Sequence, residues 1–126
     1  MNVQKQAGFT LIELVMVIVI LGILAAAAIP QFVDLSGEAN QGAVNGIAGA
    51  LSSAAAVNYA TCKTVGTSDA RCKVVNNCTD AANTLQSALP TGYTITAAAV
   101  ADNATVSCTI THTTSTKTAT FSAIGT

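Results

Sequence analysis

Few residues in this chain have side chains that could carry out chemistry. Its 126 residues include one histidine, four cysteines and six Asp or Glu side chains, and the carboxylates are scattered singly along the sequence. General acid–base catalysis needs ionisable groups that converge on one substrate. The pattern therefore does not favour an enzyme, and we assign no catalytic or cofactor-binding residue.

Glu13 is unusual because it lies inside the longest apolar run of the chain. That run extends from Phe9 to Ile29 and is interrupted only by Thr10, Glu13 and the small residue Gly22. As a helix it would be about 30 Å long, which is enough to cross the hydrocarbon core of a bilayer. A carboxylate there costs about 2.5–3.5 kcal/mol on insertion scales. Such a residue predicts a function and a cationic partner.

The eight residues before this run suggest what that partner is. Residues 1–8 form a short polar leader with Lys5 as its charged side chain, and the leader ends in Ala7-Gly8. An ordinary signal peptide loses its apolar core on cleavage, whereas a cut after Gly8 would leave the core on the mature chain. The new amino group of Phe9 could then pair with Glu13 of its own helix or of a neighbour. The alternative is an uncleaved signal anchor, with Lys5 as its positive flank, but such an anchor has no use for Glu13.

The four cysteines all follow the apolar segment. Cys62, Cys72, Cys78 and Cys108 are separated by nine, five and twenty-nine residues. An even number of cysteines in an exported domain predicts disulfides. Zinc is the rival interpretation, but no C-x-x-C pair is present, so we predict no metal site. Three pairings are possible. We favour Cys62–Cys72, which closes a short excursion after the helix, and Cys78–Cys108, which ties a connection to a strand.

Charge and composition divide the chain and limit its partners. Charged residues make up 9% and the net charge is −1, so a dedicated nucleic-acid binder is unlikely. We expect a leader at 1–8, a long helix at 9–60 whose residues 9–29 lie in a membrane or filament core, and a head at 61–126. The cations Lys63, Arg71 and Lys73 cluster near the first cysteines. They could touch DNA or an anionic surface, although a solvated loop is the favoured interpretation.

The predicted fold class is α+β: the second half of the helix packs on a small antiparallel sheet of about three strands with two disulfides. Helical spacing after residue 30 predicts an apolar face of Ala39, Ala43, Ile47, Ala50, Leu51, Ala54 and Val57. Three glycines at 42, 46 and 49 form either a seam for close helix approach or a loose helix. Alternating patterns predict strands at 93–96, 104–111 and 118–124, and Thr79 could cap a short helix from about 80 to 88.

The N-terminal residues resemble a known family. Residues 8–25, GFTLIELVMVIVILGILA, are similar to the N-terminal signature of type IV pilins and type II secretion pseudopilins. Residues 28–35 look most like type IVa major pilins of the mannose-sensitive haemagglutinin group, and Pro30 lies where major pilins usually carry a proline. The specific motif covers roughly the first 35 residues.

The resemblance implies a structural protein with no catalysis. It implies cleavage between Gly8 and Phe9 by a membrane prepilin peptidase, N-methylation of Phe9 by the same enzyme, and assembly into a helical homopolymer by the pilus assembly machinery. Glu13, Gly22 and Pro30 would serve assembly, with the stretch between Gly22 and Pro30 partly melted in the filament; a simple kink at Pro30 is the alternative. The precursor would sit in the inner membrane and the filament outside the cell, for adhesion, motility or DNA uptake. A type II secretion pseudopilin and a minor pilin acting as adhesin or DNA-binding module are the alternatives.

Overall fold

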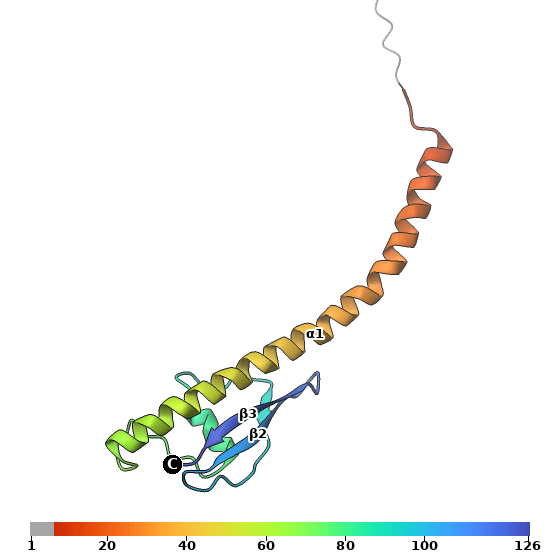
Figure 1. Cartoon of the computed structure of the whole chain (residues 1–126). Helices are drawn as coiled ribbons and strands as arrows, with labels where there is room; N and C mark the ends of the chain where they lie inside the picture. The colour runs from red at the N-terminus through yellow and green to blue at the C-terminus, as the bar shows by residue number, and fades with distance from the viewer. Residues whose placement is uncertain (1–6) are drawn as a thin grey trace, which may run out of the picture. The chain divides into compact units, whose positions relative to one another are not determined.

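The computed structural model describes residues 7–126, except for the side chains of residues 30–34. The elements follow in the order α1 (Leu11–Val65), η1 (Cys78–Thr84), β1 (Tyr93–Ile95), β2 (Thr105–His112) and β3 (Thr118–Ile124). By its contacts the chain divides into a unit that ends at Ser36 and a second unit from Gly37 to Thr126. The α+β class with a three-stranded sheet is confirmed (Figure 1). The two disulfides are confirmed as well.

Helix α1 ends at Val65 rather than near residue 60. Gly66 takes a positive φ of 84°, and its N–H donates to the carbonyl of Cys62 at 2.8 Å. This is the αL cap, which a glycine adopts without the steric cost of a Cβ. The hydroxyls of Thr61 and Thr64 donate to the carbonyls four residues earlier, at 2.9 and 2.8 Å. Gly66 was the available signal for the end of the helix.

The buried face of α1 in the second unit differs from the predicted one. Leu51 is buried as expected, and Ile47 packs against the core, but Ala43, Ala50 and Val57 are exposed. The buried residues on this part of the helix are Val44, Ala48, Leu51 and Ala55, and the first three belong to the core cluster that also holds residues of β2 and β3. The error arises because this part of the helix is rich in alanine and glycine, so neighbouring faces differ little in hydropathy.

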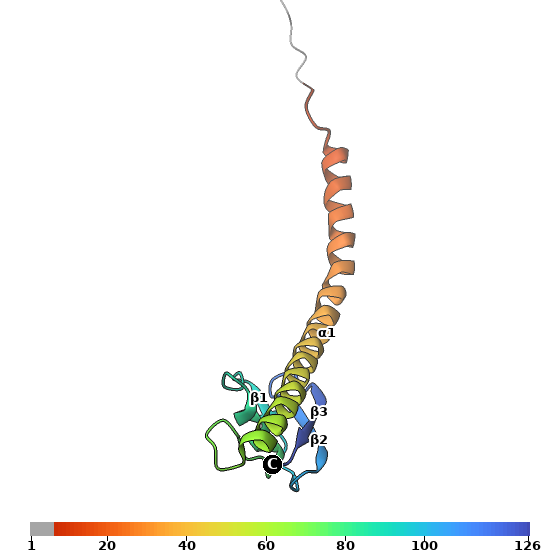
Figure 2. The same cartoon turned by 60° about the vertical axis from the view of Figure 1, so that its left-hand side comes forward.

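The sheet is an antiparallel meander in the order β1-β2-β3, and it lies beside the second half of α1 (Figure 2). Strand β2 pairs Cys108 with Phe121 and Thr109 with Thr120 of β3. The predicted alternation is confirmed: Cys108 and Ile110 are buried and Val106 half-buried against the core, while the hydroxyl residues between them face outward. At the far end of β3, a Cβ on Gly125 would collide with the backbone carbonyl of Ala101, so only glycine fits there.

The short helix is a 3₁₀ helix and begins earlier than predicted. Its cap is Asn77 and not Thr79: the Asn77 side chain accepts from Thr79 N–H at 3.2 Å, and Asp80 Oδ2 accepts from Asn77 N–H at 2.9 Å. This reciprocal pair forms a capping box. The sequence interpretation missed it because Asn77 lies two residues before Thr79, the predicted cap.

Two disulfides hold the head together in the favoured pairing, Cys62–Cys72 and Cys78–Cys108. All four residues are buried, and Cys78 and Cys108 belong to the core cluster with Leu51, Phe121 and Ala123. The sequence separations are 10 and 30 residues, which correspond on the loop-entropy model to about 2.7 and about 3.6 kcal/mol. A head of this size has a small core and benefits from such cross-links.

Candidate processing, assembly and binding sites

The first site is the N-terminal apolar segment, none of whose large apolar side chains is buried in the described structure. Phe9 is 95% exposed, and Leu11 to Leu24 carry large apolar side chains that are 44–80% exposed. The stretch Leu11–Ile29 has a mean hydropathy of 2.9 and is long and apolar enough to cross a membrane. A helix that is apolar on every face must be buried by lipid or by other helices. The apolar side chains of this segment must therefore be covered by lipid or by the helices of other chains.

Glu13 binds back to the start of the helix. Its Oε2 accepts from Thr10 N–H at 2.8 Å and from the Thr10 hydroxyl at 3.0 Å. The Glu13 N–H points to the Thr10 hydroxyl oxygen at 3.4 Å, which completes a reciprocal capping box. Sequence reasoning missed this role, although Thr-x-x-Glu before an apolar run is its known signature. Within residues 7–126, no group donates a hydrogen bond to the second carboxylate oxygen of Glu13, Oε1.

The other predicted processing and assembly residues lie as follows. Ala7 and Gly8 are exposed and outside regular structure, next to the exposed Phe9. Gly22 lies within α1, where a Cβ would meet nothing within 4 Å, and residues 22–29 are helical here. The side chain of Pro30 and leader residues 1–6 lie outside the described part of the structure.

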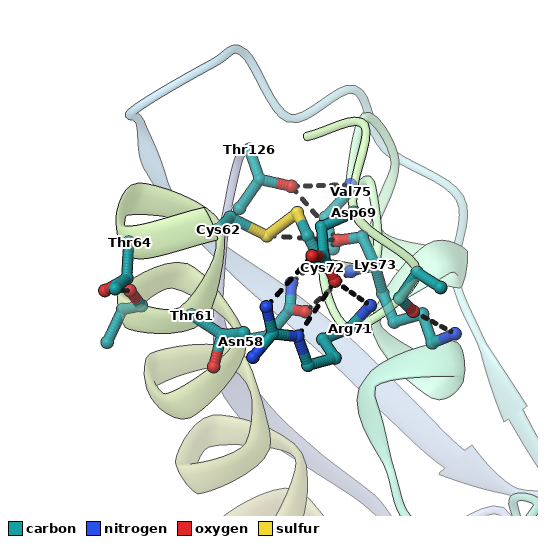
Figure 3. Close-up of a disulfide and its surroundings, with 12 residues drawn as sticks. Asn58, Thr61, Cys62, Thr64, Asp69, Arg71, Cys72, Lys73, Val75 and Thr126 are labelled. Atoms are coloured by element: carbon teal, nitrogen blue, oxygen red, sulfur yellow. Dashed lines mark hydrogen bonds and ion pairs between the residues drawn. A yellow bond between two sulfur atoms is a disulfide. The ribbon is translucent and has the colours of Figure 1, made fainter. Parts of the chain in front are cut away.

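The second site surrounds the first disulfide (Figure 3) and lies partly on residues 66–77, the strap that joins α1 to η1. Arg71 makes a forked ion pair with Asp69: Nε to Oδ1 and Nη2 to Oδ2, both at 2.9 Å. The forked pair lowers the pKa of the Asp69 carboxyl and raises that of the Arg71 guanidinium. Both side chains are accessible, so the pair adds little stability. Its main consequence is that the guanidinium is held in one orientation.

Two of the three clustered cations meet at this site and one does not. Arg71 and Lys73 line the same cavity, and the Lys73 ammonium donates to the Ala70 carbonyl at 3.1 Å. Lys63 does not line this cavity; its Nζ lies over the Tyr59 ring, 5.2 Å from the ring centroid. Across residues 7–126 no cluster of three His, Cys, Asp or Glu side chains could hold a metal ion.

Asn58 fixes the strap to the helix, a role that sequence reasoning missed. Its amide nitrogen donates to the Lys73 carbonyl at 2.7 Å, and its oxygen accepts from Lys73 N–H at 2.8 Å. Asn58 is only 6% exposed, so these two bonds satisfy a buried amide. An asparagine in a helical pattern ordinarily suggests a solvated position, so the sequence offered no signal for this contact.

One family model matches the N-terminal residues of this chain. Residues 3–29 match the family model of the prokaryotic N-terminal methylation motif. The chain is 50% identical over 66 residues to the type IV narrow pilus major component PilA5 of Thermus thermophilus, covering 52% of this chain and 57% of that protein.

Two further relatives divide between pilins and a secretion component. The chain is 52% identical over 46 residues to the type IV major alpha-pilin of Moraxella bovis, covering 36% of this chain and 28% of that one. It is 46% identical over 55 residues to type II secretion system core protein G of Pseudomonas aeruginosa, covering 40% and 39%. The matches thus cover 57% of the length of the first of these relatives and 39% of the length of the secretion protein. No solved structure matches.

Proposed function

We propose that this chain, whose N-terminal residues match the methylation motif and which is similar to a type IV pilus major component, is the major structural subunit of an extracellular type IV pilus. The precursor is held in the inner membrane by Leu11–Ile29, and the mature chain polymerises through the same helix. The observation that carries the proposal is the exposed apolar surface of this helix. Lipid covers that surface before assembly, and the helices of neighbouring subunits cover it afterwards.

Processing at the Gly8–Phe9 bond would release the subunit from its leader. The exposed, irregular backbone at Ala7 and Gly8 supports access for a prepilin peptidase. The match of residues 3–29 to a methylation motif supports methylation of the new Phe9 amine. The partners proposed for this chain are accordingly the peptidase, the pilus assembly machinery and other copies of itself.

Glu13 would set the register between subunits. One carboxylate oxygen caps its own helix through Thr10, and the other is available to a neighbour's Phe9 amine. In an apolar bundle an unpaired carboxylate is costly, so an incoming subunit is most stable at the stagger that brings a cation to it. Gly22 and Pro30, both unfavourable within a helix, would let residues 22–30 loosen in the filament.

The experiment that tests this function is the composition of surface filaments. Filaments sheared from the cells should contain this chain as their most abundant protein, and deleting its gene should remove them. A complemented strain serves as the control. Surface filaments that persist without the gene would contradict the assignment.

The likeness to the type II secretion core protein supports a second candidate, a subunit of a short periplasmic pseudopilus. The same shear fractions discriminate the two, because a pseudopilus leaves the chain with the cell body and its deletion stops secretion instead. A minor pilin that acts as adhesin or DNA-binding module would be present in filaments at a small fraction of the major subunit.

A further inference from the structure

We propose that the cavity beside the first disulfide binds a carboxylated saccharide, with Arg71 and Lys73 holding the carboxylate. The cavity has a volume of about 410 Å³, within the range of small-molecule sites. Its walls come from α1, from Arg71 and Lys73 on either side of Cys72, and from residues 83–86 at the end of η1 and just after it. The inference does not depend on polymerisation and concerns a different unit of the chain.

The cations are presented to the cavity by contacts that leave part of each free. Arg71 uses Nε and Nη2 toward Asp69, and within residues 7–126 Nη1 has no recorded partner. The Lys73 ammonium makes one bond, to the Ala70 carbonyl, and carries three donors. Each cation can therefore donate to an anion in the cavity without giving up its present contacts.

The wall that carries these cations is rigid. The Cys62–Cys72 disulfide joins the strap to the helix, and the two bonds of Asn58 hold the backbone of Lys73. Arg71 is fixed further by its own N–H, which donates to Asp69 at 2.9 Å. A site whose donors are already oriented loses less entropy on binding. This arrangement favours the binding of one specific ligand over the non-specific electrostatic attraction of any anion.

The net charge of the site limits the ligand to a single carboxylate. Asp69 offsets Arg71, so Lys73 leaves the cavity with about one positive charge. Nucleic acid is bound by basic tracks that neutralise several phosphates, with aromatic side chains that stack on bases. The cavity lining includes no aromatic residue, so it does not fit a nucleic-acid strand.

The remaining lining fits a sugar ring. Ser53, Asn83 and Gln86 line the cavity with exposed polar side chains that can exchange hydrogen bonds with hydroxyls. Val57, 68% exposed, adds an apolar surface beside them, which a ring face of C–H groups can cover. A carboxylate attached to a polyhydroxylated ring uses both kinds of wall, whereas a bare carboxylate uses only the cations.

The test titrates the oxidised full-length chain in neutral detergent micelles and follows backbone amide shifts by NMR. The probes are glucuronate, glucose, which lacks the carboxylate, and acetate, which lacks the ring. We expect saturable glucuronate shifts confined to the cavity walls, with affinity at least about tenfold above both controls. Equal binding of glucose, equal binding of acetate, or no saturable shift would each overturn the proposal.

Variants separate the cavity from general charge. Arg71→Gln and Lys73→Gln should each weaken glucuronate binding by about tenfold or more, and Arg71→Lys should recover it only partly because the guanidinium fork is lost. Lys117→Gln removes a cation that precedes β3 and does not line the cavity, so it should bind like the wild type. An equal loss in Lys117→Gln would refute the site. The disulfide mass and amide spectrum of each variant verify its fold.

Discussion

Glu13 has two possible roles at the start of α1, and two substitutions separate them. It caps the helix through Thr10, and we propose that its charge also pairs with a neighbour's amino group. Glu13→Gln keeps a capping side chain, because Gln serves as well as Glu at this position of a capping box, but it removes the charge. Thr10→Ala keeps the charge and removes the cap.

The two substitutions should reduce the filament yield by very different amounts. Charge pairing relieves a carboxylate cost of about 2.5–3.5 kcal/mol, which corresponds to a factor of about 60–300 in subunit docking. Losing a helix cap costs about 1 kcal/mol, a factor of about 5. Glu13→Gln should therefore nearly abolish filaments, whereas Thr10→Ala should lower their yield modestly.

The assay is the filament yield in shear fractions, relative to the membrane pool, in cells that lack the native copy. Cleavage after Gly8 should be normal in both variants, since processing precedes assembly, and it serves as the control for insertion. The reasoning is refuted if Glu13→Gln gives wild-type yields. It is also refuted if Thr10→Ala fails as severely as Glu13→Gln, because capping would then be the main role.

Three further predictions concern processing, packing and pH. Gly8→Val should leave uncut precursor in the membrane, because a branched side chain crowds the scissile bond; a precursor band on a gel is the measure, and normal cutting would contradict the assignment. Gly125→Ala should destabilise the head by about 1–3 kcal/mol through overpacking against the neighbouring backbone. Gly49→Ala, whose Cβ meets open space, should instead stabilise it by up to about 1 kcal/mol because alanine is the better helix former. Denaturant unfolding measures the free energy of unfolding of both variants. The pKa of Asp69 is lowered chiefly by its side-chain bond to Arg71. The ion pair should therefore be intact at any pH above the ordinary aspartate pKa and should be lost as the pH falls through the lower pKa of the folded chain. ¹³C NMR of the Asp69 carboxyl should show a higher pKa in Arg71→Gln than in the wild type.

The sequence predicted the sheet and the disulfides because their patterns are local and high in contrast. Cys108 and Ile110 alternate with threonines along β2, so the period of two identifies the buried face directly. The favoured cysteine pairing rested on the predicted elements, since Cys62 and Cys72 flank a short excursion after the helix and Cys108 falls within a predicted strand. The face of α1 was predicted wrongly because Ala43, Ala48 and Ala50 are the same residue type, so hydropathy does not distinguish the buried Ala48 from the two exposed alanines.

In the sites, too, contacts between residues close in sequence could be predicted, whereas contacts between residues far apart in sequence could not. Glu13 was identified from the cost of a carboxylate in an apolar run, yet its bonds to Thr10 needed only the spacing of the two residues and were overlooked. The contact between Asn58 and Lys73 joins residues fifteen positions apart and depends on the path of the strap. No local pattern encodes that path, so the wall of the cavity became visible only in three dimensions.

The most direct test of the central claim is the intact mass of this chain in sheared surface filaments. The account predicts a chain that lacks residues 1–8, carries one methyl group on Phe9, and weighs four hydrogens less than its reduced form because both disulfides are closed. Fragmentation should place the methyl group on the terminal amine. A filament chain that retains its leader, or filaments that lack this chain altogether, would contradict the account.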